Sequence, residues 1–217
     1  LIVRTQNPPG RAPYNFGGAT PTLMTGRRMP DVSTYLLVDG ENIDATLGMS
    51  VLDRRPAPEE RPRWDRVLAA TKRIWGQATS PLFFLNGSSG TLPMPFVQAL
   101  MAMEYRPVPL SGPAHVKVVD VGIQRTLRAI LDRGEGSVLL ASHDGDFVPE
   151  MRALLEAGHP VGVVCFKEFL SSHLQELVEL GLEVFDLESD FDAFQVRLPR
   201  LRIIDIEEYD PFEFLDA

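Results

Sequence analysis

The stretch LLASHDGDF, residues 139–147, ends an apolar run in two aspartates that stand one residue apart. A short apolar run of this kind, followed by turn residues, is typical of a buried strand. Phe147 then opens a helical stripe with Met151, because residues four apart share one face of a helix. Asp144 and Asp146 therefore mark the point where a predicted strand gives way to a predicted helix.

The same alternation extends over the body of the chain. Runs of apolar residues predict five buried strands, at residues 34–40, 81–87, 137–142, 160–166 and 182–187. The prolines of YRPVPL, residues 105–110, confine a sixth strand to a sheet edge. Helical spacing separates the strands, and a last helix is predicted from Leu170 to Val178, ending at Gly181. We therefore expect an α/β fold, a parallel sheet with helices on both faces in a single domain.

Composition sets limits on the class of protein. A chain of 217 residues with 44% hydrophobic and 24% charged residues is ordinary for one well-filled globular domain. No apolar stretch is long enough to span a bilayer, and the first residues show no secretory signal. The single cysteine, Cys165, excludes an intramolecular disulfide and favours a reducing compartment. We expect a cytoplasmic protein with no membrane partner.

Charge divides the chain into three parts. Residues 1–33 are rich in Pro, Gly and Arg and predict a flexible arm, whereas residues 188–217 form an acidic tail that also carries aromatic residues. Residues 34–187 hold the alternating strands and helices. The net charge of −9 makes the protein a poor partner for nucleic acid unless cations occupy its acidic site.

Four carboxylates fall at strand-to-helix transitions. Asp39 ends the first strand, Asp120 begins a helix, and Asp144 and Asp146 follow the strand at residues 137–142. In an open parallel sheet such positions meet at one edge, where ligands bind. Unpaired carboxylates there would repel one another, and hard divalent cations such as Mg²⁺ or Mn²⁺ relieve that repulsion. The pattern indicates metal-dependent phosphodiester hydrolysis.

Each acid alone also has an ordinary structural interpretation. Asp39 with Gly40 makes a strand-ending turn, and Asp144 is a suitable N-cap residue. Asp146 in the first turn would be favoured by the helix dipole. The combination of all the acids on one side of the sheet favours a functional site.

Three motifs carry a resemblance to a known family. YLLVDGENI (residues 35–43), KVVDVGI (residues 117–123) and LLASHDGDF, in this order, resemble the NYN family of PIN-like nucleases, in particular its LabA-like branch. The resemblance covers residues 34–186. It implies a Rossmann-like, PIN-like sheet and an endoribonuclease that acts on RNA with Mg²⁺ or Mn²⁺. The catalytic residues that it implies are Asp39, Asn42, Asp120, Asp144 and Asp146, with the four aspartates as metal ligands. It also assigns substrate contacts to Ser142 and Lys117.

The basic residues of the body concentrate in residues 54–73, which carry a net charge of +4. Arg54, Arg55 and Arg63 in this run are candidates for binding an RNA backbone, single-stranded RNA being favoured. Many such runs are only a solvated helix face. Both interpretations stay open at the level of sequence.

One departure from the family weakens the case for catalysis. Thr126 stands near the position where the family often has a further aspartate in the helix after KVVD. The alternative function is therefore a catalytically weak or inactive module that binds RNA, or a protein through the arm or tail. A homo-oligomer is compatible with either function. The motif DGDFV also fits aspartyl-nucleophile phosphatases, but it comes too late in the chain for that class. A receiver-like phosphoacceptor lacks the acid pair that its first strand requires.

Overall fold

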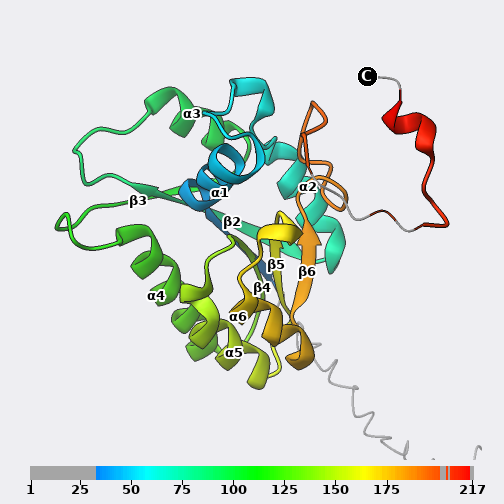
Figure 1. Ribbon diagram of the computed structural model, residues 1–217. Helices are drawn as coiled ribbons and strands as arrows, with labels where there is room; N and C mark the ends of the chain where they lie inside the picture. Colours follow the sequence, from blue (N-terminus) through cyan, green and yellow to red (C-terminus); the bar gives the residue numbers. More distant parts are fainter. Residues whose placement is uncertain (1–32, 201–203, 205, 216–217) are drawn as a thin grey trace, which may run out of the picture. The chain divides into compact units, whose positions relative to one another are not determined.

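A computed structural model describes residues 33–200, 204 and 206–215 of the chain. A parallel sheet with helices on both faces makes up most of this part (Figure 1). The strands are β1 (Ser33–Asp39), β2 (Ala78–Asn86), β3 (Arg106–Leu110), β4 (Ser137–Ala141), β5 (Val161–Cys165) and β6 (Glu183–Asp186). The helices are α1 (Gly40–Thr46), α2 (Trp64–Ile74), α3 (Met94–Ala102), α4 (Val118–Arg133), α5 (Val148–Glu156) and α6 (Ser172–Gln175).

The described strands run parallel in the order β3-β2-β1-β4-β5-β6. The predicted α/β fold is thus confirmed. Pro107 and Pro109 lie in β3 at the sheet edge, as predicted, because a proline cannot donate to a second neighbouring strand. Chain order reverses between the paired strands β1 and β4, and a crevice at their carboxyl ends is where ligands bind in such sheets.

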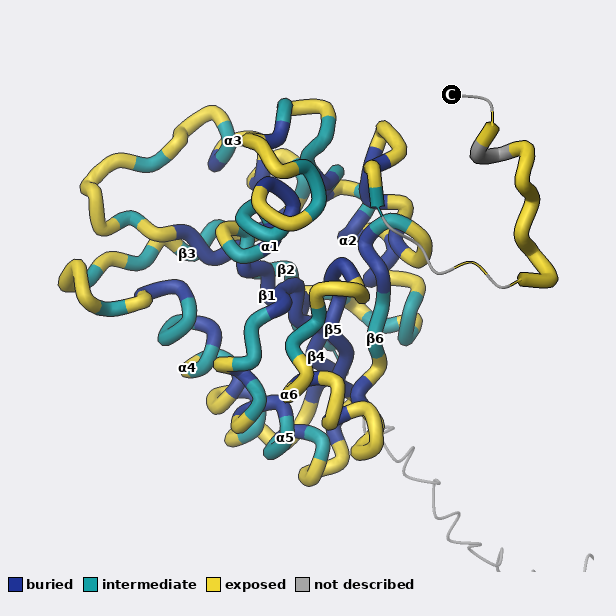
Figure 2. Tube along the Cα trace, in the orientation of Figure 1, coloured by how far each residue is buried: buried dark blue, intermediate teal, exposed yellow. Residues whose placement is uncertain are grey.

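Two hydrophobic layers sandwich the sheet, because successive side chains of a strand point to opposite faces. In β1, Leu36 and Val38 pack with α1, α2 and α3, whereas Leu37 packs with α4, α5 and α6. Strands β4 and β5 are correspondingly buried along their whole length, and β1 along most of it (Figure 2). Burial on both faces explains why these strands read as continuous apolar runs.

Residues 187–200 complete the first layer. Phe191, Phe194 and Leu198 belong to the hydrophobic cluster of this face, where Phe191 packs edge-on against Phe185 of β6 and Phe194 stacks on Phe166, which follows β5. Part of the predicted acidic tail is therefore built into the hydrophobic core. The predicted arm lies outside the described residues apart from Ser33, which begins β1.

The last predicted helix was wrong in its extent. The α-helical part covers only Ser172–Gln175, and a 3₁₀ segment, Glu176–Leu180, follows it. Leu170 precedes the helix in an extended conformation, and Val178 is exposed. Gly181, with φ of 100°, ends the segment as expected. Only the buried residues Leu174 and Leu177 anchor this stretch, so its apolar stripe is too narrow for a longer amphipathic helix.

None of the helices in the described parts of the chain combines the length and the apolar character that crossing a bilayer demands.

Candidate metal centre

The loops that follow β1 and β4 bring the predicted acids together. A cleft of about 370 Å³ opens at the carboxyl ends of these strands, and its lining includes Asp39, Asn42, Lys117, Asp120 and Asp144. It coincides with the reversal of strand order, so the topology and the acidic residues mark the same place.

Three carboxylates form a compact cluster. Each of Asp120, Asp144 and Asp146 offers an oxygen atom, and these three oxygens all lie within 4.8 Å of one another. Asp120 comes from the first turn of α4, and the other two come from the loop after β4. The donor set consists of oxygen alone, which suits hard divalent cations. These three residues therefore fit a single metal ion, whose identity the geometry leaves open.

The DGD sequence folds into a tight turn that sets this geometry. The Oδ1 atom of Asp144 accepts a hydrogen bond of 2.9 Å from the backbone N–H of Asp146, so Asp144 is the N-cap of a 3₁₀ turn that leads into α5. Ser142 Oγ accepts from the backbone N–H of Asp144 at 3.2 Å. A Cβ on Gly145 would lie 2.6 Å from Ser171 Oγ, so a side chain there would force the serine hydroxyl to move. The two aspartates thus project from a hydrogen-bonded turn.

Lys117 supplies the positive charge nearest to the cluster. Its Nζ atom lies 2.9 Å from Oδ2 of Asp146 and 3.3 Å from Oδ2 of Asp120. The hydrogen bonds to Asp146 and Asp120 raise the pKa of Lys117 above its ordinary value. The formal charges of Lys117 and the three aspartates sum to −2, which one divalent cation would neutralise.

Asp39 lies beside the cluster but in a different environment. Its carboxylate is buried, accepting hydrogen bonds from the backbone N–H of Asn42 and from Ser142 Oγ, each at 3.2 Å. Burial raises the pKa of Asp39 to about 6, and the charges of Asp120 and Asp144 act in the same direction. The structure therefore places Asp39 in the same cleft while leaving it outside the three-carboxylate cluster.

Asn42 and His143 connect the chain after β1 to the loop after β4. The Oδ1 atom of Asn42 accepts from the backbone N–H of His143 at 2.8 Å and lies 2.9 Å from its Nδ1. His143 Nε2 accepts from the backbone N–H of Phe166 at 2.9 Å, so the proton of the neutral ring is on Nδ1. Burial lowers the pKa of His143 to about 4 and so keeps the ring neutral. This contact holds Asn42 at the rim of the cleft.

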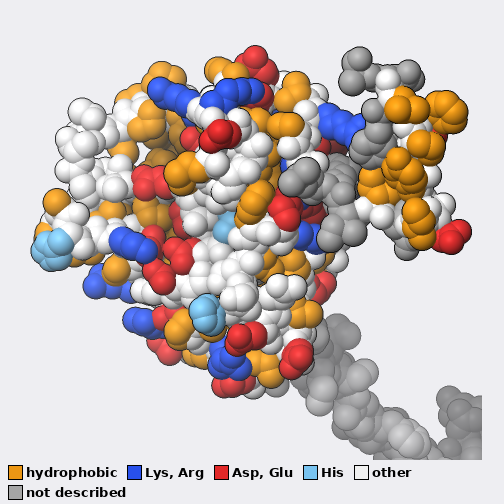
Figure 3. Space-filling model, viewed as in Figure 1, with side chains coloured by type: hydrophobic (Ala, Val, Ile, Leu, Met, Phe, Trp, Pro, Cys, Tyr) orange, Lys and Arg blue, Asp and Glu red, His pale blue; other side chains and the backbone are white. Residues whose placement is uncertain are grey.

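The predicted substrate-binding arginines do not line the cleft. Arg54 is paired with Glu60 at 2.5 Å, and Arg63 with Asp65 at 3.1 Å. Arg54 and Arg55 border a separate hollow next to α1. In the space-filling view, basic side chains lie interspersed with acidic ones (Figure 3). The basic run is thus largely neutralised by neighbouring carboxylates.

Side chains near Thr126 make contacts that the sequence alone did not indicate. The Thr126 hydroxyl donates to the carbonyl of Gly122 within its own helix, at 2.8 Å. Gln124 donates from Nε2 to the backbone carbonyl of Asp146 at 3.1 Å and supports the DGD turn. Glu150, a buried acid in the first turn of α5, is paired with Arg128 at 2.5 Å. The spacing of Gln124 from Asp120, one helical turn, was the signal that could have identified it.

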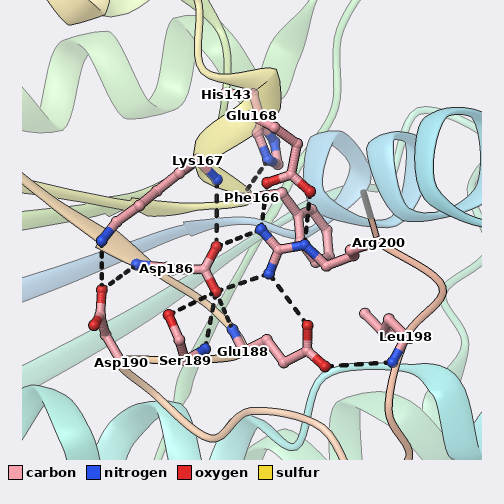
Figure 4. Close-up of polar contacts among 10 residues, drawn as sticks. All are labelled: His143, Phe166, Lys167, Glu168, Asp186, Glu188, Ser189, Asp190, Leu198 and Arg200. Carbon is pink, nitrogen blue, oxygen red and sulfur yellow. Dashed lines mark hydrogen bonds and ion pairs between the residues drawn. The ribbon is translucent and has the colours of Figure 1, made fainter. Parts of the chain in front are cut away.

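A second charged cluster, centred on Arg200, holds segment 187–200 in place (Figure 4). Arg200 is almost fully buried, and its guanidinium bonds Asp186 at 2.6 and 2.8 Å and also contacts Glu168 and Glu188. The same guanidinium stacks over the ring of Phe166, 5.1 Å from its centre, and that ring stacks on His143. Segment 187–200 is therefore connected to the rim of the acidic cleft through a continuous set of contacts.

Fold and site together define an open α/β domain with an acidic cleft at its topological switch point. No family model matches the chain, and no curated protein matches it. The fold is similar to the crystal structure of a protein of unknown function from Vibrio parahaemolyticus, with a TM-score of 0.57 and 18% identity. That similarity covers 74% of this chain and 96% of the other. It shows the fold alone, so function has to be argued from the site.

Proposed function

We propose that this chain is a divalent-metal-dependent endoribonuclease that hydrolyses phosphodiester bonds of RNA. The observation that carries the proposal is the convergence of Asp120, Asp144 and Asp146 in an open cleft at the switch point of the sheet. The choice of RNA follows from the ordered motifs that resemble the NYN family. Mg²⁺ or Mn²⁺ is the proposed ion because the donors are all carboxylate oxygens.

A cation held by these carboxylates would supply positive charge to the phosphate oxygens of a substrate. The protein's own residues would position the strand. Lys117 has an exposed ammonium group at the edge of the cluster and is placed to contact a phosphate. Asn42, fixed by His143, offers an oriented amide at the same edge. Asp39, with its raised pKa, can take up a proton near neutral pH.

The test is incubation of the purified protein with a labelled single-stranded RNA in Mg²⁺, Mn²⁺ or EDTA. Asp144→Asn is the informative variant, because Asn keeps the acceptor that caps the 3₁₀ turn and removes one charged ligand. Asp132→Asn is its matched control, since Asp132 is exposed and lies near the far end of α4. Cleavage that needs metal, persists in the control and falls at least about 100-fold in Asp144→Asn is expected. Equal cleavage by both variants would assign the activity to a contaminant.

Lys117 favours a second candidate, an RNA-binding or protein-binding module without turnover. Its ammonium already contacts two of the three clustered carboxylates and offsets part of their repulsion without a metal. The exposed apolar residues Ile206, Phe212 and Leu215 of the tail also suit a protein partner. Intact RNA under all metal conditions, with retention of the RNA in EDTA, would support this module over the nuclease.

A further inference from the structure

A second cavity, largely apolar, adjoins the acidic cleft. It measures about 460 Å³ and lies among α1, the start of α2, the end of β2 and α3. Trp64, Phe83 and Phe96 supply its aromatic lining, together with aliphatic side chains such as Leu92. In the space-filling view, hydrophobic side chains gather in the recess beside α3 (Figure 3). A cavity of this size and lining is of the kind that binds small molecules.

The aromatic rings form an ordered wall. Phe83 lies at the centre, with the ring of Trp64 at 5.1 Å and the ring of Phe96 at 5.4 Å, both nearly perpendicular to it. Trp64 and Phe83 are buried, whereas Phe96 and Leu92 are partly exposed and can be reached from the surface. Because the ring of Phe96 can be reached from the surface, a planar ligand that enters the cavity can stack on it.

The cavity shares a wall with the acidic cleft. Glu41 and Asn86 line both spaces, and Gly40, which lines the apolar cavity, directly follows Asp39. The ring of Phe83 packs on Gly40 so closely that a Cβ there would lie 2.5 Å from it. A ligand extending from one space into the other would therefore pass over the β1–α1 turn, with one group beside the carboxylates and the next in the apolar cavity.

The two arginines at the apolar cavity are paired with aspartates. Arg61 is bonded to Asp44 at 3.3 Å, and Arg63 to Asp65 at 3.1 Å. These pairs leave little positive charge to attract a phosphate into the cavity. Glu41 and Asn86 provide oxygen atoms at the shared wall, which can accept hydrogen bonds from the amino groups of a base. An uncharged planar group with hydrogen-bonding edges fits this lining better than an anion.

We propose that this cavity holds one unpaired base of an RNA strand whose adjoining phosphate lies at the carboxylate cluster. The inference rests on the proposed function, since it names the part of the same substrate that is recognised beside the metal centre. It limits the substrate to single-stranded or locally unpaired RNA, because a base within a duplex cannot reach the aromatic wall.

Phe96→Ala is the primary variant, because it removes the reachable part of the aromatic wall. Met101→Ala is its matched control, since Met101 is an exposed residue of the same helix that does not line the cavity. Leu92→Trp is a second variant that fills the cavity without opening a void in the core. Thermal unfolding of all the variants shows whether each is folded.

Binding is measured by fluorescence anisotropy in Ca²⁺, which supplies a cation for the carboxylates, and gel electrophoresis checks that the strand stays intact. The probes are a labelled oligoribonucleotide and a series of the same strand with one abasic residue moved along it. The wild type and Met101→Ala should lose roughly 10-fold in affinity for one abasic position, and folded Phe96→Ala and Leu92→Trp should bind intact and abasic strands alike. Equal affinities for all strands in the wild type would overturn the proposal and leave the cavity to an apolar side chain of a protein partner.

A saturation-transfer NMR experiment with adenosine and uridine separates this inference from the proposed function. Nucleoside binding that is lost in Leu92→Trp, in a protein that cleaves no RNA, would support the base site and contradict the nuclease. Metal-dependent cleavage by a protein whose cavity variants bind RNA like the wild type would support the nuclease and contradict the base site. A protein that binds neither nucleosides nor RNA would overturn both.

Discussion

The Nζ atom of Lys117 lies 2.9 Å from Oδ2 of Asp146, so an ammonium group occupies the edge of the three-carboxylate cluster. A divalent cation at this cluster and the lysine would compete for the same carboxylates. Metal affinity and the position of Lys117 should therefore depend on each other.

Lys117→Met should bind Mn²⁺ more tightly than the wild type, because the variant removes a competing cation and leaves the carboxylates unpaired. Lys117 is mostly exposed, so a gain of less than about 10-fold is expected from an ion pair of this kind. Isothermal titration with Mn²⁺ measures it. Lys72→Met is the control, since Lys72 is paired with Glu104 instead. Weaker binding in Lys117→Met would show that the lysine supports the site rather than competes for it.

Asp39→Asn should stabilise the metal-free protein above neutral pH. Because the folded-state pKa of Asp39 is raised, its contribution to stability is present below about pH 4 and is lost as the pH rises through about 6. A rise of about two pKa units corresponds to about 3 kcal/mol, which the variant should recover at pH 8 but not at pH 4. Urea unfolding in EDTA across this range measures the difference. An equal effect at both pH values would contradict the role of the buried charge.

His143 should make stability depend on pH in the direction opposite to that of Asp39. Its folded-state pKa is depressed, so its contribution to stability is present above about pH 6.5 and is lost as the pH falls through about 4. In an Asp39→Asn background, unfolding free energy should therefore fall on acidification over this interval. Adding His143→Gln should flatten that dependence, even though the lost bond to Asn42 lowers stability overall. A slope that persists in the double variant would assign it to other groups.

Arg200→Met should destabilise the domain by about 3 kcal/mol, because it leaves Asp186 buried without its partner. Burial alone would raise the pKa of Asp186, but the hydrogen bonds and charge of Arg200 more than offset this and hold it below its usual value. The stabilising effect of the pair is thus present above about pH 4 and lost on further acidification. Chemical denaturation is the measurement, with the exposed Arg197→Met as control. Equal stability of the two variants would contradict the structural role of Arg200.

Local patterns were sufficient to predict the sheet and the convergence of three acids. Burial on both faces gave the strands their continuous apolar runs, and the prolines of β3 allowed only an edge position. Asp120, Asp144 and Asp146 could be placed together because parallel strands end at a common edge.

Other features depend on contacts between distant residues. Arg54 and Arg63 are basic in the sequence, but their carboxylate partners decide how much charge remains. Phe191 and Phe194 stand three residues apart, a spacing typical of a helix, yet they lie in turns and irregular chain that pack on the sheet. The aromatic cavity is likewise assembled from α1, α2, β2 and α3, and no single motif encodes it.

The position of segment 187–200 after the last strand has a consequence for biosynthesis. As the chain is made from its N-terminus, Phe166 and Phe185 lack their aromatic partners until Phe191 and Phe194 have left the ribosome. This part of the core therefore closes only after all six described strands have been synthesised. A released chain truncated after Leu187 would keep all six described strands but leave this face open and prone to aggregation.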